Sequence, residues 1–364
     1  MQQVIGKVLI LSLLVSCGSG GGSDSISNAT LYNTQALTGN SQSTPTTRYD
    51  KTFPTSSWDT ASPENVGLKQ TRVDSLINTM TLAEGFILIK DGYILHEQYK
   101  NNKFEPHLIA SISKSIYTTS FLPLMDEAKI SFDSYVRDHI DWFVDIEQGS
   151  EYVRTFGDLM SMQSGLIPLR RLTDGEWWNE DPFTLIHETK TIDRDYGHWY
   201  YNNGNIVLQT IALQNECDCD VRDNLANINN ELGIRSADLT TTEQGNPTVY
   251  GGIRMDLPDL ARWGLLWANE CSWDDQKVII SCMPLFEQTH TTNDCYTPDS
   301  NYDFNLCEGM SWDYGYSFYL KDGWIFASGL GDKYVLFHPT YDIVAVVFGV
   351  AFDTFYTQLN NLLY

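Results

Sequence analysis

A short segment at residues 110–117 holds the residue types and the spacing that nucleophilic chemistry needs. It follows a polar stretch that contains Pro106 and opens an apolar run with helical spacing, which predicts a helix N-terminus with Ser111 and Lys114 in the first turn. Residues three apart share a helix face, so the Lys114 amine can reach the Ser111 hydroxyl. A serine attacks only when a base takes its proton, and the free N–H groups of a first turn stabilise an anion. The segment therefore offers a nucleophile, a candidate base and half of an oxyanion site.

The elements predicted on either side of this segment must position it. Before it, the sequence predicts a helix that starts at Ser62 and Pro63, then a hairpin at 85–99. The apolar stripe of that helix consists of Val73, Leu76, Ile77 and Met80. After it, Pro123 is expected to kink or end the helix that carries the nucleophile.

The rest of the chain divides into a helical part and a strand-rich part. From 132 to about 248, helical patterns and long polar loops dominate and strand signals are few. From 249 onward, the sequence predicts a helix at 257–270, four strands, and a last helix capped by Asp353. The four strands are expected at 314–320, 324–328, 333–338 and 343–350.

Together these elements predict an α/β (α+β) fold with one antiparallel sheet flanked by helices. The sheet is built from both ends of the chain and is faced by the first and last helices. A single domain at 58–364 is expected, with α/β parts at 58–115 and 249–364. The helical lobe at 116–248 is then an insertion, and the nucleophile lies at the seam.

The composition limits the classes of partner. With 47 acidic and 23 basic side chains, the formal charge is −24, which argues against nucleic acid and against an anionic bilayer surface, because polyanion binding depends on Lys and Arg. The expected partner is a small-molecule substrate, and the protein is expected to be a monomer.

No cofactor or metal is expected. The sequence has no Gly-rich phosphate loop, and His187-Glu188 lacks the second histidine of a zincin. Alternating Asp and Asn at 299–305 could hold Ca²⁺, but no glycine occupies the sixth position of an EF-hand loop, so a solvated acidic loop is favoured. Trp177-Trp178 is consistent with either an acyl pocket or core packing.

The N-terminus has the pattern of an export signal. Lys7 precedes an apolar run at 8–15, which is too short to span a bilayer. Residues 14–17, Leu-Val-Ser-Cys, resemble the bacterial lipoprotein box, which implies cleavage before Cys17 and its lipidation; an ordinary signal peptide with an incidental cysteine is the alternative. A signal peptide at 1–17 and a flexible linker at 18–57 are thus expected. The body would lie on the periplasmic side of a bacterial membrane, and Gly18 favours the outer one by resemblance to lipoprotein sorting.

Export also favours disulfides for the six remaining cysteines, which allow 15 pairings. Local closure favours Cys271 with Cys282 and Cys295 with Cys307. Cys217 and Cys219 are then left over as a short, strained loop, so that one of these pairings is open to question. A zinc site is the rival, but no paired Cys-x-x-Cys and no histidine cluster accompany them.

Three ordered motifs give the sequence a resemblance to a known family. The segment 111–115, Ser-Ile-Ser-Lys-Ser, resembles the nucleophile motif of the serine β-lactamase and penicillin-recognising superfamily, in the class C branch that includes esterases and 6-aminohexanoate-dimer hydrolases. The flanking segments 153–166 and 251–263 resemble the same branch. The resemblance implies a fold of the β-lactamase/transpeptidase type and hydrolysis through an acyl-enzyme.

The second motif, at 199–205, is similar to the Tyr-x-Asn element of the family. A phenol held against the nucleophile and the lysine relays protons between the nucleophile and the leaving group. Two registers fit, Tyr200 with Asn202 and Tyr201 with Asn203. The flanking residues favour Tyr201 as the catalytic tyrosine and Asn203 as a substrate-binding residue. Alternatively, these aromatic residues only belong to the core.

The third motif, Phe-Ala-Ser-Gly-Leu-Gly at 326–331, falls on a predicted strand where the family has Lys-Thr-Gly or His-x-Gly. The resemblance implies that the backbone N–H groups of Ser111 and Leu330 form the oxyanion hole, and that Ser328 and Gly329 bind substrate. A plain strand with a bulge is the alternative for the glycine.

One residue of the third motif bears on the substrate. Ala327 stands where β-lactam-recognising members have a cation for the substrate carboxylate. The expected function is therefore a serine hydrolase for an ester or small amide that lacks that carboxylate. The alternatives are a β-lactamase or D,D-peptidase, and a non-catalytic binding protein on the same fold.

The sequence leaves the identity of the base open. Lys114 must be uncharged to accept a proton, which requires a pKa shift from about 10.4 to near 7. Burial beside the helix N-terminus and a hydrogen-bonded Tyr201 could produce that shift. Otherwise Lys114 stays charged and Tyr201 is the base.

Overall fold

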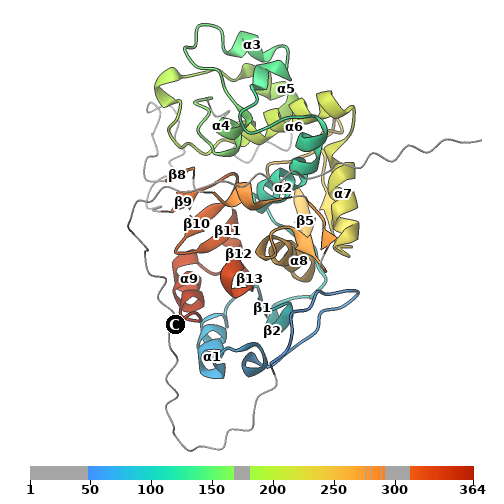
Figure 1. Cartoon of the computed structure of the whole chain (residues 1–364), viewed down its shortest axis with the longest axis vertical. Helices are drawn as coiled ribbons and strands as arrows, with labels where there is room; N and C mark the ends of the chain where they lie inside the picture. Colours follow the sequence, from blue (N-terminus) through green and yellow to red (C-terminus); the bar gives the residue numbers. More distant parts are fainter. Residues whose placement is uncertain (1–47, 168–180, 275, 280, 288, 292–311) are drawn as a thin grey trace, which may run out of the picture. The chain divides into compact units, whose positions relative to one another are not determined.

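The largest sheet of the described chain is antiparallel (Figure 1). The computed structural model describes residues 48–167, 181–274, 276–279, 281–287, 289–291 and 312–364, which belong to one compact unit. In this part of the chain the sheet has eight strands, in the order β2-β1-β13-β12-β11-β10-β9-β8. Their bounds are β1 Gly85–Lys90, β2 Tyr93–Tyr99, β8 His290–Thr291, β9 Asp313–Tyr314, β10 Tyr319–Lys321, β11 Trp324–Gly329, β12 Lys333–His338 and β13 Ile343–Phe348.

Strands from the two ends of the chain, β1 and β13, are neighbours in this sheet, as the sequence predicts. All six residues of β1 and of β13 are buried, and the two strands pair antiparallel from Gly85 with Phe348 to Lys90 with Ile343. β1 and β2 form the predicted hairpin. The expectation of one antiparallel sheet built from both ends is therefore confirmed.

Helices cover both faces of the sheet. Side chains alternate along each strand, so one face packs with α1 (Gln70–Thr79) and α9 (Phe352–Asn360), the predicted first and last helices. The other face packs with α8 (Leu257–Ala268) and α2 (Ile112–Glu127). Gly264 of α8 is needed for this packing, because a Cβ there would lie 2.5 Å from Val344 of β13.

The helical part lies between α2 and α8 in the sequence. Its helices are α3 (Phe143–Ile146), α4 (Phe156–Met160), α5 (Pro182–Leu185), α6 (Asn203–Cys217) and α7 (Val221–Glu231), with 3₁₀ turns η2 (Val136–Asp138), η4 (Ile186–Glu188) and η5 (Asp193–Asp195). A small sheet of β3 (His107–Leu108), β5 (Ile253–Met255) and β4 (Asp238–Leu239) was not predicted. Its strands are too short to produce a period-two signal. The boundaries of the predicted lobes stay a prediction.

Four details differ from the predicted elements. Ser62 and Pro63 begin a separate 3₁₀ turn, η1 (Pro63–Val66), because the chain leaves the helical conformation at Gly67 with φ 80°. α2 continues beyond Pro123 to Glu127. Asp353 lies in the first turn of α9 rather than at its N-cap. The strand predicted at 314–320 is divided into β9 and β10.

The chain is already held to the sheet before residue 58, within the predicted linker. The Thr52 N–H donates to the Asp91 carbonyl. Arg262 of α8, which is 3% exposed, donates to the carbonyls of Pro54 and Thr55 at 3.0 Å each. Its guanidinium also lies 5.6 Å from the ring centre of Trp58. These contacts use backbone carbonyls, which leave no signature in the side-chain pattern.

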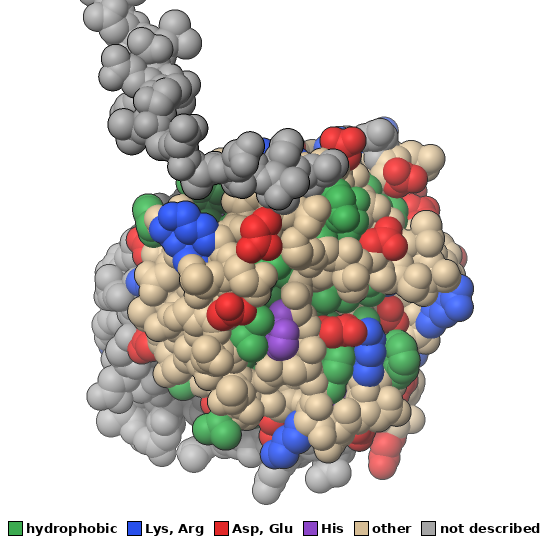
Figure 2. Space-filling model, turned by 90° about the horizontal axis from the view of Figure 1, so that it is seen from below, with side chains coloured by type: hydrophobic (Ala, Val, Ile, Leu, Met, Phe, Trp, Pro, Cys, Tyr) green, Lys and Arg blue, Asp and Glu red, His purple; other side chains and the backbone are tan. Residues whose placement is uncertain are grey.

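The visible surface is mixed in character. Figure 2 shows acidic and basic side chains interspersed on one face, with hydrophobic side chains in small separate groups. None of the helices in the described ranges combines the length and the apolar character that a bilayer span requires.

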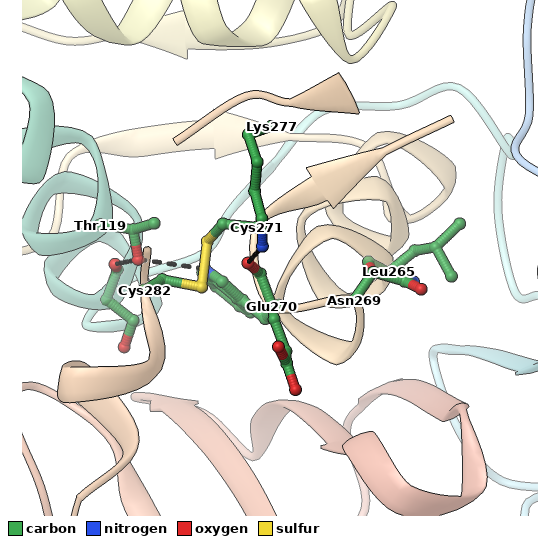
Figure 3. The surroundings of a disulfide bond; sticks show 9 residues. Thr119, Leu265, Asn269, Glu270, Cys271, Lys277 and Cys282 are labelled. Atoms are coloured by element: carbon green, nitrogen blue, oxygen red, sulfur yellow. Dashed lines mark hydrogen bonds between the residues drawn. A yellow bond between two sulfur atoms is a disulfide. The ribbon is translucent and has the colours of Figure 1, made fainter. Parts of the chain in front are cut away.

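Two disulfides are present in the described part. The predicted pair Cys271–Cys282 forms, and Cys217 pairs with Cys219 across two positions of sequence. Cys295 and Cys307, whose pairing was predicted, lie outside the described residues. The Cys271–Cys282 disulfide ties the segment that follows α8 to the end of that helix (Figure 3). This segment includes β6 (Ser272–Trp273) and β7 (Gln276–Lys277).

The Cys271–Cys282 bond lies close to the junction of two helices of the site. The neighbouring Trp267 of α8 donates its indole N–H to the Thr119 hydroxyl of α2 at 3.0 Å. We expect the double substitution Cys271→Ala/Cys282→Ala to lower the free energy of unfolding by about 2–3 kcal/mol, because the closed loop restricts the unfolded chain. Urea unfolding followed by tryptophan fluorescence measures this loss.

The other disulfide provides the control for this prediction. The double substitution Cys217→Ala/Cys219→Ala opens a much shorter loop and should cost only about 1–2 kcal/mol. Equal losses in the two variants would contradict the loop-closure explanation.

Candidate active site

Helix α2 is buried on all sides and presents Ser111 at its N-terminal end. Every residue from Ile112 to Phe121 is buried, and Ser111 itself is the N-cap. The preceding residue, Ala110, has φ 50°, a conformation that few non-glycine residues adopt and that marks local strain. The chain changes direction at Ala110, directly before the helix begins. The Ser111 side chain is only half-buried there.

The amine of Lys114 reaches Ser111, as its position in the first turn predicts. Its Nζ lies 3.0 Å from the Ser111 Oγ and donates to the Tyr250 carbonyl oxygen at 2.6 Å. Lys114 is 2% exposed, and burial holds the pKa of its amine well below the usual range. No salt bridge joins Lys114 to a carboxylate in the described ranges, so nothing of that kind restores the charge that burial disfavours.

Tyr201 completes the cluster. Its ring centre lies 4.8 Å from the Lys114 Nζ, and its hydroxyl is hydrogen-bonded to Ser111. Burial raises the pKa of the Tyr201 phenol, and the hydrogen bond with Ser111 offsets this only in part. The phenol is therefore neutral at ordinary pH, whereas the uncharged amine of Lys114 is favoured. Of the two bases that the sequence leaves open, this electrostatic environment favours Lys114.

The start of α6 distinguishes the two tyrosine registers. Asn202, the asparagine of the alternative register, caps α6: its Oδ1 accepts from the Gly204 N–H and its Nδ2 donates to the Leu166 carbonyl. Tyr201 precedes this cap and projects to the nucleophile, while Asn203 is the first residue of the helix. The structure thus brings Tyr201 together with the nucleophile and its lysine.

The third motif lies beside the nucleophile segment at the end of β11. A Cβ on Gly329 would stand only 2.3 Å from the Ile109 carbonyl oxygen, so that only glycine permits this approach of strand and segment. Leu330 follows at the strand end and is 82% exposed. The Lys333 ammonium donates to the Leu330 carbonyl at 3.1 Å, which fixes the turn after the strand.

The neighbours of Gly329 on β11 point to opposite faces of the sheet. Ser328 is half-buried, whereas Ala327 is fully buried in the core that contains α2 and α8. The position of Ala327 therefore offers no charge to a substrate. No cluster of three or more His, Cys, Asp or Glu suited to a metal is found in the described part. The acidic segment 299–305 and Trp177-Trp178 lie outside it.

This arrangement places the Lys114 amine and the Tyr201 phenol against the Ser111 hydroxyl at a helix N-terminus. With these pKa shifts the amine can accept a proton, the phenol can supply one, and helix and strand N–H groups can stabilise a negative oxygen. Residues 85–354 match the Beta-lactamase family, which is most of the chain. The chain belongs to the Beta-lactamase family.

Solved structures with the β-lactamase/transpeptidase fold agree with this membership. A Bacillus anthracis protein assigned as a 6-aminohexanoate-dimer hydrolase has TM-score 0.64 and 16% identity over 87% of this chain and 86% of its own. EstCE1, a hydrolase with promiscuous acyltransferase activity, has TM-score 0.59 and 12% identity over 81% and 98%. A penicillin binding protein from Bacillus halodurans has TM-score 0.57 and 15% identity over 79% and 98%. No curated protein matches the sequence significantly.

Two backbone carbonyls of the site were not predicted from the sequence. The Tyr250 carbonyl accepts from Lys114, and the Ile109 carbonyl sets how closely Gly329 approaches. A backbone acceptor has no side-chain signature, so no motif could have indicated either. Only the glycine of the third motif gave an indirect signal of the close approach.

This contact generates a test of the Beta-lactamase-family site. We expect Gly329→Ala to lower kcat for an ester at least ~100-fold, because the added methyl moves the strand end away from the helix N-terminus and misplaces an oxyanion donor. Steady-state kinetics with a p-nitrophenyl ester measures the loss.

Gly264→Ala is the matched control, since it adds one methyl at an equally close contact between α8 and the sheet. It should lower the melting temperature but leave the kinetics near those of the wild type below melting. An equal loss of activity in both variants would show that Gly329 acts only through stability.

Proposed function

We propose that the protein is a serine hydrolase that cleaves an ester or a small amide through an acyl-enzyme at Ser111. The observation that carries this proposal is the buried Lys114 amine in hydrogen-bond contact with the Ser111 hydroxyl, because burial lowers the pKa of that amine well below its usual range. Burying a lysine without a charged partner lowers the stability of the fold, and a lysine with a strongly lowered pKa is characteristic of functional sites. Family membership supports hydrolysis as the class of reaction.

The proposed reaction follows from the protonation states. The Ser111 oxygen attacks the substrate carbonyl carbon while the Lys114 amine takes its proton, and the carbonyl oxygen becomes an anion near the N–H groups of Ser111 and Leu330. Tyr201, neutral because of its raised pKa, donates a proton to the leaving oxygen or nitrogen, and the Lys114 ammonium replaces that proton. Water then cleaves the acyl-enzyme by the reverse assignment of roles.

The substrate class follows from the third motif. Ala327 is buried and uncharged where β-lactam-recognising members of the family have a cation. A substrate carboxylate would find no partner there, which disfavours a β-lactamase or D,D-peptidase. We expect little turnover of nitrocefin, and rapid turnover would contradict this inference.

Covalent labelling tests the proposed function directly. A fluorophosphonate probe should modify the wild-type protein at Ser111, because the neighbouring base activates that hydroxyl. Mass spectrometry of the labelled peptide identifies the site. Labelling that persists in Ser111→Ala would contradict Ser111 as the nucleophile, and absent labelling would favour a binding protein on this fold.

The proposed proton relay predicts non-additive kinetics. Lys114→Ala and Tyr201→Phe should each lower kcat for a p-nitrophenyl ester at least ~100-fold, and the double variant should fall hardly further, because the first loss already disables proton transfer. Tyr200→Phe should stay near the wild type. A collapse in Tyr200→Phe with normal rates in Tyr201→Phe would shift the register to Tyr200 and Asn202.

We also propose that the protein is anchored through a lipidated Cys17 on the periplasmic side of a bacterial membrane, the outer membrane being favoured. The support is the sequence of residues 8–18, which lies outside the described residues. Radiolabelled palmitate should be incorporated into the wild type but not into Cys17→Ala, which should become soluble. An unlabelled, soluble wild type would contradict the anchor.

A further inference from the structure

The loop at residues 240–252 brings a backbone carbonyl to the Lys114 amine. The Tyr250 carbonyl oxygen accepts a hydrogen bond from the Lys114 Nζ at 2.6 Å, across 136 positions of sequence. Because this contact is made by the backbone, its geometry does not depend on a side-chain rotamer. It depends on whatever fixes the turn that contains the carbonyl.

That turn, at residues 248–252, is closed by its own backbone. The N–H groups of Gly251 and Gly252 donate to the Thr248 carbonyl at 3.2 and 2.8 Å. A Cβ on Gly252 would overlap the Thr248 hydroxyl, so the chain can approach itself this closely only with glycine there. Thr248 and Tyr250 are 3% and 2% exposed. The Tyr250 carbonyl therefore belongs to a compact and buried turn.

Thr240 connects the two ends of this turn. Its hydroxyl donates to the Gly252 carbonyl at 2.6 Å and lies 2.5 Å from the Thr248 hydroxyl. The Thr248 hydroxyl is also 2.9 Å from the Thr240 carbonyl, which accepts from the Thr248 N–H at 3.1 Å. The two threonine hydroxyls thus link residue 248 to residue 252, on either side of the carbonyl that meets Lys114.

The chain that follows the turn is tied to the nucleophile segment. The Ile253 N–H donates to the Ser113 hydroxyl of α2 at 3.2 Å, and the Ile253 carbonyl accepts from the Ile109 N–H at 3.0 Å. Ser113 directly precedes Lys114. The turn is therefore fixed against α2 on one side and against Thr240 on the other, so that the threonine pair sets where the carbonyl stands.

The Tyr250 carbonyl has two effects on the Lys114 amine. An uncharged amine has two N–H groups and one lone pair. When the carbonyl accepts one N–H, the lone pair is left to face the Ser111 hydroxyl, whose oxygen is 3.0 Å from the Nζ. The carbonyl oxygen also carries a partial negative charge, which favours the ammonium form and acts against the effect of burial on the pKa.

Few titratable side chains face this amine. Tyr201, from the segment before α6, has its ring centre 4.8 Å from the Lys114 Nζ. Burial is the cause of the lowered pKa of Lys114, and no carboxylate of the described residues contributes to it. Asp181, the N-cap of α5, acts on the Tyr250 phenol instead, since burial and then the charge of Asp181 raise the pKa of that phenol.

We propose that Thr240 and Thr248 are positioning residues for the catalytic lysine. Their paired hydroxyl groups hold the Tyr250 carbonyl against the Lys114 amine, which keeps the lone pair directed at Ser111. This inference rests on the proposed function, in which Lys114 is the base. It gives a role in the reaction to the start of the segment 251–263, whose glycines allow the turn to close.

Valine substitutions test the threonine pair, because valine replaces the hydroxyl with a methyl group of similar size. Thr240→Val and Thr248→Val should each lower kcat for a p-nitrophenyl ester about tenfold, since a slightly displaced base is a poorer one. The KM should stay within about twofold, because the threonines act through Lys114 rather than on substrate binding. Thr240→Ser and Thr248→Ser keep the hydroxyl and should stay near the wild type.

The pH profile separates this role from a purely structural one. The acidic limb of kcat/KM reports the pKa of the base in the free enzyme. Loss of the carbonyl acceptor disfavours the ammonium form of Lys114, so this limb should move to lower pH in both valine variants. An acidic limb that stays in place in both variants would overturn the inference, even if kcat falls.

Thr242→Val is the matched control from the same loop. Thr242 is 8% exposed, but its hydroxyl lies 3.3 Å from the Asp181 carboxylate and accepts from the Asn246 N–H at 3.3 Å. This substitution should lower the melting temperature about as much as Thr248→Val and leave kcat and the pH profile unchanged. The same displacement of the acidic limb in Thr242→Val would show that any loosening of the loop suffices, which would overturn the inference.

A direct titration of Lys114 distinguishes this inference from the proposed function. In protein labelled with ¹³C at lysine Cε, the chemical shift follows protonation of each amine, and Lys114→Met identifies the Lys114 signal. The midpoint should move to lower pH in Thr240→Val but not in Thr242→Val. If the wild type hydrolyses no ester, the proposed function is wrong, yet a displaced midpoint still supports the threonine pair. An identical midpoint in all variants would overturn it.

Discussion

The structure depends on burying one lysine, Lys114, inside an acidic protein, which lowers the pKa of its amine well below the usual range. The chain has 47 acidic side chains, yet the Lys114 amine meets only a serine oxygen, a backbone carbonyl and the face of an aromatic ring among the described residues. A carboxylate at hydrogen-bond distance would favour the ammonium form and remove the base. The surrounding fold therefore has to exclude both water and acidic side chains from the first turn of α2.

That exclusion explains why α2 is buried on every side although its sequence is rich in hydroxyl groups. Each hydroxyl needs a partner once water is removed. Ser115 donates to the Ser317 carbonyl, Thr118 donates to the Ser317 hydroxyl, and Thr119 accepts from the Trp267 indole. The segment between β9 and β10, which interrupts the strand expected there, supplies two of these partners. The break between β9 and β10 at the sheet edge thus supplies hydrogen-bond partners to the buried hydroxyl groups of α2.

The sequence predicted the parts of this structure that depend on side-chain periodicity. The buried strands β1 and β13 consist almost entirely of apolar residues, so their existence could be inferred. The spacing of Ser111 and Lys114 predicted their contact, because it requires only one helical turn. The separation of η1 from α1 was not predicted, since it depends on the backbone of Gly67 rather than on the apolar pattern.

The missed features are contacts between distant segments. The Tyr250 carbonyl is 136 residues from Lys114 in the sequence, and nothing in the local sequence marks it as an acceptor. Such a contact depends on the tertiary arrangement, which places a backbone oxygen beside the nucleophile.

The anchoring of the chain near residues 52–55 also has a mechanical consequence. A pull applied through the preceding residues is borne first by the Thr52 hydrogen bond to the hairpin turn and by the Arg262 bonds to Pro54 and Thr55. These bonds fasten the chain to β1, β2 and α8, whereas the N-terminal end of α2 takes no part in them. A force that enters the chain at residues 52–55 therefore acts on β1, β2 and α8 before it acts on the N-terminal end of α2.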